Sequence, residues 1–161
     1  MSANTSHNAK FAYGVGLINP SRAPYPSLVY DLDGKDYVYF LCSQGYNGKL
    51  LETIARDKSS CSSKSNKETA NNLNYPSFSL SIKDPKFVNG VFHRTVTNFG
   101  SLNSTYSAKV VAPSGLKISV NPSVLSFTSL RQKKSFVVIV KGSIEKSNIV
   151  SASLVWDDDA F

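Results

Sequence analysis

Apolar residues follow two different spacings along the chain, one before residue 57 and another after residue 72. From Leu73 onward, apolar and polar residues alternate in short runs, a pattern typical of half-buried β-strands. Glycine, proline and asparagine separate the runs at intervals that indicate an antiparallel β-sandwich. The seven predicted strands are SFSLSI, VFHRTVTN, TYSAKVVA, LKISV, VLSF, KKSFVVIVKG and IVSASLVW.

The alternation also predicts which side chains point into the sandwich. Hydrophobic residues make up 41% of the 161 residues, which is enough to build a packed core. The predicted inward residues are Phe78, Leu80, Val96, Tyr106, Ile118, Val120, Leu125, Phe127, Phe136, Val138, Val140, Leu154 and Trp156.

Helical spacing appears only between residues 33 and 56. Asp33 is a suitable N-cap for a helix over about 34–43 that ends at Gly45, with Tyr37, Phe40 and Leu41 on one face. Asn47 can cap a second helix over about 48–56, which would bury Leu50, Leu51 and Ile54. Residues 1–32 are predicted to be extended chain and turns, and the polar residues 57–72 a loop or linker.

The amount and distribution of charge limit the kinds of partner that we expect the chain to bind. The chain carries a formal charge of +7, mostly in its second half, as single lysines along the predicted strands. No basic run or recognition module points to nucleic acid, and no stretch is long and apolar enough to span a membrane. We therefore expect neither nucleic acid nor membrane as a partner.

Two cysteines and two acceptor sites suggest a chain made in an oxidising compartment. Cys42 and Cys61 are the only cysteines, and a disulfide between them would close a loop of about 20 residues and contribute roughly 3 kcal/mol. Asn4 and Asn103 each begin an Asn-x-Ser/Thr tripeptide and are candidates for N-glycosylation.

Candidate catalytic residues are few. His7 lies in a polar terminus, and His93 lies on a predicted strand where the alternation places it at the surface or edge of the sandwich. No Gly-x-Ser-x-Gly motif is present, and two distant histidines with two paired cysteines make a poor metal site. Gly14-Val15-Gly16 lacks the third glycine of a dinucleotide-binding loop. The residues alone thus predict no active site, no metal and no cofactor.

Several stretches taken together resemble the C-terminal part of plant subtilisin-like serine proteases of the cucumisin type. FAYGVGLINPSRA is similar to that family's Phe-x-Tyr-Gly-Ala-Gly-His-Val-Asn-Pro segment, and PSLVYDLDGKDYVYFLCSQGY to its Pro-Gly-Leu-Val-Tyr-Asp and Phe-Leu-Cys-x-x-Gly-Tyr stretches. LNYPSF resembles the start of the family's fibronectin type III-like domain. RTVTNFG, STYSAKVVAPSGLKISVNPSVLSF and SLVWDDD resemble its successive strands.

The resemblance implies a mainly β chain in which an antiparallel fibronectin type III-like sandwich follows a short helical remnant of a subtilisin-like catalytic domain. Residues 1–56 would be that remnant, 57–72 a linker and 73–161 the sandwich without its last strand. In the family, the catalytic Asp, His and Ser and the oxyanion-hole Asn all precede the Phe-x-Tyr-Gly segment. The resemblance therefore implies that this chain holds no catalytic residue.

The chain departs from the family pattern near both ends. Leu17, Val15 and Ser27 stand where the family usually has His, Ala and Gly, and the sequence stops at WDDDAF where family members continue into another strand. The resemblance implies an extracellular protein, but the polar N-terminus has no apolar core of a signal peptide. Met1 would then be an internal methionine of a longer protein or a misassigned start.

Three functions are compatible with these observations. The leading one is a non-catalytic C-terminal fragment of a secreted subtilisin-like endopeptidase, which supports the catalytic domain or contacts a second copy. The second is a free-standing binding or regulatory sandwich. The third is a piece of a complete serine protease whose catalytic part lies outside this chain.

Overall fold

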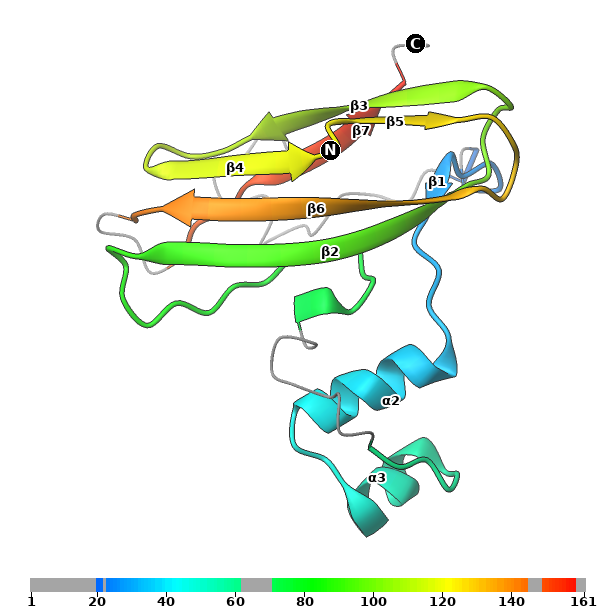
Figure 1. The fold of residues 1–161 in the computed structure, drawn as a ribbon, viewed down its shortest axis with the longest axis vertical. Coiled ribbons are helices and arrows are strands. Elements are labelled where there is room, and N and C mark those ends of the chain that lie inside the picture. The colour runs from blue at the N-terminus through cyan, green and yellow to red at the C-terminus, as the bar shows by residue number, and fades with distance from the viewer. Residues whose placement is uncertain (1–19, 22, 62–70, 145–148, 159–161) are drawn as a thin grey trace.

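The computed structural model describes residues 20–21, 23–61, 71–144 and 149–158, which form a β-sandwich with a small helical segment beside it (Figure 1). One sheet has the strand order β1-β2-β6-β4 and the other β5-β3-β7, and every pairing is antiparallel. The strands are β1 (Leu28–Val29), β2 (Val88–Asn98), β3 (Ser104–Val111), β4 (Leu116–Asn121), β5 (Val124–Phe127), β6 (Lys133–Gly142) and β7 (Ser153–Asp157). The predicted mainly β sandwich with short helices is confirmed.

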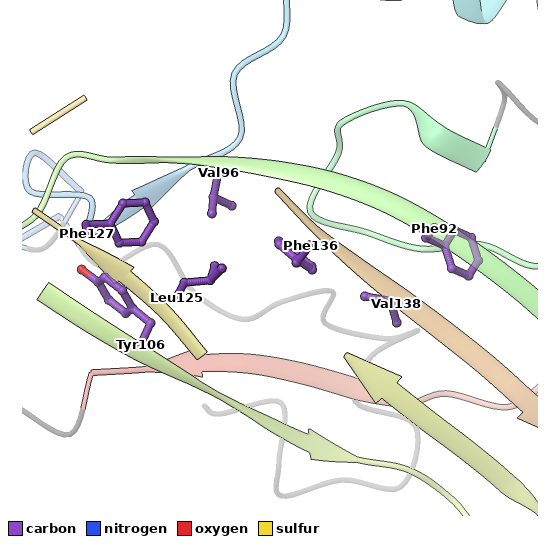
Figure 2. Close-up of a cluster of buried hydrophobic side chains, with 7 residues drawn as sticks. All are labelled: Phe92, Val96, Tyr106, Leu125, Phe127, Phe136 and Val138. Carbon is purple, nitrogen blue, oxygen red and sulfur yellow. The ribbon is translucent and has the colours of Figure 1, made fainter. Parts of the chain in front are cut away.

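The core lies between the two sheets (Figure 2). Its fully buried members are Phe92, Val96, Tyr106, Leu125, Phe127, Phe136 and Val138. All thirteen predicted inward residues belong to this cluster or pack against it, because side-chain alternation along the strands reports directly which face is covered. Aromatic rings meet edge to face, with 5.0 Å between the ring centres of Phe136 and Trp156. Each fully buried side chain contributes about 1.5–3 kcal/mol.

The first predicted strand, SFSLSI, is wrong. Residues 77–82 form no strand, although Phe78 and Leu80 still pack against the core. The alternation here reflects the packing of Phe78 and Leu80 and not a pairing of backbones, and on the edge of β2 the side chains of Asn72 and Asn74 accept from the His93 and Thr95 N–H groups. The last predicted strand, IVSASLVW, is shorter than expected, since pairing with β3 covers only Ser153–Asp157.

The helices begin and end close to their predicted positions. Helix α2 spans Gly34–Ser43 and helix α3 spans Gly48–Ala55. Asp33 caps α2 by accepting hydrogen bonds from the backbone N–H groups of Lys35 and Asp36, and the Asp36 carboxylate accepts from the Asp33 N–H in return. Gly45, with φ of +94°, adopts the left-handed backbone that stops the helix.

The expected N-cap of α3 is confirmed in its position, since Asn47 precedes the helix with an extended backbone, but its side chain makes no capping hydrogen bond. The expected burial of the apolar residues of α3 is confirmed for only one of them. Leu51 is fully buried, whereas Leu50 and Ile54 are 55% and 45% exposed. In α2, likewise, Tyr37 is exposed while Phe40 and Leu41 are half-buried. Two short helices cannot cover both sides of each other, so part of their apolar surface faces outward.

Candidate functional site: the junction of the helical segment with the sandwich

Residues 27–31 join the helical segment to the sandwich as an added strand. Leu28 and Val29 of β1 pair with Asn98 and Thr97 at the end of β2. The Ser27 carbonyl accepts hydrogen bonds from the N–H groups of Phe99 and Gly100, at 2.9 and 3.0 Å. This part of the predicted catalytic-domain remnant is thus built into the four-stranded sheet.

Asp31 ties the end of this segment to two strands by its carboxylate. The carboxylate accepts a hydrogen bond from the Thr97 hydroxyl, and it lies 3.2 Å from the Lys133 ammonium. The hydrogen bond from Thr97, and then the hydrogen bond and charge of Lys133, hold the pKa of Asp31 below its ordinary value, while partial burial opposes them. Asp31 is therefore a charged anchor at the surface end of the junction.

Asn74 connects three segments through one amide group. Its Oδ1 accepts from the Thr95 N–H at 2.8 Å. Its Nδ2 donates to the carbonyls of Thr95, at 2.8 Å, and Asp31, at 3.0 Å. Asn72 acts in the same way two residues earlier, since its Oδ1 accepts from the His93 N–H at 3.0 Å. These two amides satisfy backbone groups on the edge of β2 that a further strand would otherwise pair.

Arg94 completes the junction from inside the sandwich. Its buried guanidinium lies 4.6 Å from the ring centre of Phe78 and donates to the backbone carbonyls of Asn71, Tyr75, Ser77 and His93. Burial lowers the pKa of Arg94, and burial also raises the pKa of nearby Tyr30, which the charge of Arg94 partly offsets. The four carbonyls replace the carboxylate that usually accompanies a buried arginine.

The sequence offered a signal for Arg94 but none for the two asparagines. Arg94 occupies an inward position of its strand, between Phe92 and Val96, so the alternation alone places it under the surface. Asn72 and Asn74 reach backbone groups 21 residues away, and no local pattern reports contacts at that distance.

A polar hollow of about 290 Å³ lies over the junction. Asp31, Asp36, His93 and Lys133 are among its lining residues. His93, the one described histidine, is exposed, as its place on the strand predicted. Within the described ranges no group of three or more His, Cys, Asp or Glu side chains could hold a metal ion. Asp31 binds Thr97 and Lys133, and the two asparagines bind backbone groups of β2, so the groups around the hollow serve mainly to hold segments of the chain together.

The remaining predicted site residues lie apart from the junction. Cys42 and Cys61 form a disulfide that ties α2 to the polar segment after α3, with Cα atoms 5.6 Å apart. Asn103 is exposed in the turn before β3, with φ of +55°, and its glycosylation stays a prediction. Asn4 and His7 lie outside the described residues.

Comparisons with known proteins agree with the observed fold of the sandwich and show relatives that are similar over nearly the whole chain. The sequence model of the fibronectin type-III domain family matches residues 72–161. Subtilisin-like protease SBT4.6 of Arabidopsis thaliana is 48% identical over 98% of this chain and 22% of its own length. Subtilisin-like proteases SBT4.14 and SBT4.12 of the same plant are 45% and 47% identical, over 97% and 94% of this chain and 21% of each protease.

The match covers nearly all of this chain but only about a fifth of the length of these relatives, whose C-terminal part it resembles. None of the described helices has the length and apolar character needed to cross a membrane. Because the family's sequence model covers more than half of the residues and the observed sandwich agrees with it, the chain belongs to the fibronectin type-III domain family.

Proposed function

We propose that this chain is the non-catalytic C-terminal part of a secreted subtilisin-like serine endopeptidase. In this proposal the sandwich stabilises the catalytic part, and the helical segment packs against it. The similarity to about a fifth of each relative supports the assignment to a protease. The disulfide supports secretion, since such bonds persist mainly in oxidising compartments.

The exposed apolar side chains of the helical segment carry the proposal. Leu50 and Ile54 on α3, and Tyr37 on α2, remain between 45% and 55% exposed. Tyr37 and Ile54 line a hollow of about 710 Å³ between α2 and the end of α3, and Leu50 lies one helical turn before Ile54. Exposed apolar side chains gathered around a hollow are typical of a site that another part of a protein covers. Because the relatives are proteases that extend well beyond the matched region, we infer that the catalytic part of the protease covers this surface.

A replacement experiment tests the proposal. The stretch of SBT4.6 that this chain matches is exchanged for residues 1–161, and a second SBT4.6 variant ends before that stretch. We expect the hybrid to react with a serine-directed phosphonate and to lose this reactivity on heating more slowly than the shortened protease. We expect no labelling of the isolated chain. Equal heat loss in the two proteases, or a labelled serine in the isolated chain, would contradict the proposal.

A pair of variants on α3 separates packing from general damage. Leu50→Asp with Ile54→Asp places charge on the exposed apolar side of the helix, whereas Thr53→Asp changes an exposed polar position of the same helix. The first variant should speed heat inactivation of the hybrid without changing the melting of the isolated chain. Thr53→Asp should change neither the heat inactivation nor the melting. If both variants have the same effect, the exposed apolar side of α3 is not a contact with the catalytic part.

A further inference from the structure

Four large apolar side chains are exposed at one end of the sandwich, and we call them the loop-end patch. Tyr25 is 82% exposed, Phe99 44%, Leu102 60% and Leu130 52%. They come from the segment before β1, the β2–β3 connection and the β5–β6 connection. Figure 1 shows these three pieces of chain at the same end of the sandwich, where the blue segment enters it. Apolar side chains scattered singly need no explanation, but four on adjoining connections do.

Asn98 fixes the two loops that carry most of the patch. Its side chain is fully buried and donates to the carbonyls of Ser101 and Ser129, at 3.0 and 3.4 Å. Its Oδ1 accepts from the Gly100 N–H at 3.0 Å, and its own carbonyl accepts from the Arg131 N–H at 2.7 Å. One amide thus holds the β2–β3 loop against the β5–β6 loop.

The segment before β1 is held to the same place. The Ser27 carbonyl accepts from the N–H groups of Phe99 and Gly100, so Tyr25 lies two residues from a fixed contact with the β2–β3 loop. Three pieces of chain therefore share one set of hydrogen bonds around Asn98. Loops that present apolar side chains from a fixed framework are suited to a defined contact with another body.

The position of the patch indicates which part of a longer protein would contact it. The chain enters the sandwich through residues 23–27, at the patch itself. Whatever precedes this segment in a longer protein is therefore joined to the sandwich at the end that carries the patch. Its relatives have about four-fifths of their length outside the matched region.

We propose that the loop-end patch is the surface by which the sandwich contacts the catalytic part of the protease, an inference that rests on the function proposed above. The patch and the exposed helical face would give two separate contacts with the same body. Contacts between domains of one chain commonly bury about 600–1,500 Å², more than four side chains supply, so two contacts are expected.

Carbene footprinting of the isolated chain and of the folded SBT4.6 hybrid tests the contact. We expect labelling of Phe99, Leu102 and Leu130 to fall severalfold in the hybrid. Phe87 and Val111 are 79% and 70% exposed at the other end of the sandwich and serve as matched controls whose labelling should not change. Unchanged labelling of the loop-end patch in the hybrid would overturn the inference, and so would equal protection at both ends.

Charge placed on the patch gives a second measurement. Leu102→Asp with Leu130→Asp should speed heat inactivation of the hybrid, while the isolated chain keeps its melting temperature and Phe87→Asp changes neither protein. If the proposed function is wrong, the unmodified hybrid will inactivate as fast as the shortened protease. The footprint can still be measured on the folded hybrid, so the contact is tested whether or not the proposed function holds. An active hybrid that tolerates both aspartates would contradict the contact alone.

Discussion

The sandwich and the helical segment are held together by different kinds of interaction. Seven fully buried side chains form the core of the sandwich, and three aromatic pairs within or beside it meet edge to face. In the helical segment, the structure describes α2 and α3 in full, and Cys42 and Leu51 are their buried residues. That segment depends instead on a disulfide, a capping box and the hydrogen bonds of Asp31 and Asn74. The comparison teaches that the sandwich has a hydrophobic core of its own, whereas the helical segment is held mainly by covalent and polar links.

The contrast between the two regions would fail most clearly if the loss of a large side chain from the core of the sandwich left its stability unchanged. Phe136→Ala removes a ring that is 1% exposed and meets Trp156 edge to face. We expect a loss of about 3–5 kcal/mol in the free energy of unfolding. Leu50→Ala, on the exposed side of α3, should change it by less than about 0.5 kcal/mol. Urea unfolding followed by circular dichroism measures both, and similar losses would show that the two regions share one core.

Arg94 tests whether the junction belongs energetically to the sandwich. Arg94→Met keeps the apolar stem but leaves the carbonyls of Tyr75 and Ser77 without their donor. We expect a loss of about 3 kcal/mol, because charged hydrogen bonds to buried carbonyls are expensive to leave unmade. Hydrogen exchange should also rise at the His93 and Thr95 amides, which the neighbouring asparagines protect. Lys117→Met, at an exposed position of β4, is the control and should leave both measurements unchanged.

Removing the disulfide should weaken one region and spare the other. Cys42→Ala with Cys61→Ala opens a loop between residues 19 positions apart, which corresponds to about 3 kcal/mol for the structure that the loop encloses. We expect limited proteolysis to cut the helical segment rapidly while the melting of the sandwich stays the same. Reduction of the unmodified chain should give the same result. A matching fall in the melting temperature of the sandwich would show that the two regions unfold together.

Asp31 should contribute the smallest effect, and its sign is fixed by its pKa. Since the folded pKa lies below the ordinary 3.8, the stabilisation is present above that value and is lost as the pH falls through the folded pKa. The side chain is 41% exposed, so Asp31→Asn should cost less than about 1 kcal/mol at neutral pH. The difference from the unmodified chain should vanish in acid. A double-mutant cycle with Thr97→Val should assign it to that hydrogen bond, and a difference that persists in acid would contradict the assignment.

The sequence was informative wherever a residue's role depended on its near neighbours. Alternation identified the inward residues of the sandwich, and Asp33 with Gly45 marked the limits of α2. It misled at SFSLSI, where a strand pattern is present but the edge of β2 is occupied by the amides of Asn72 and Asn74. It also overestimated burial on α3, because helical spacing shows which side of a helix is apolar but not whether anything covers it.

The attachment of the helical segment depends on the identity of a single atom, the Nδ2 of Asn74. This nitrogen faces two carbonyl oxygens, those of Asp31 and Thr95. Asn74→Asp would exchange the nitrogen for an oxygen, so that two donated hydrogen bonds become two repulsions between oxygens. The exchange adds one negative charge and hardly changes the shape of the side chain. A change of one heavy atom would thereby loosen the attachment of the helical segment.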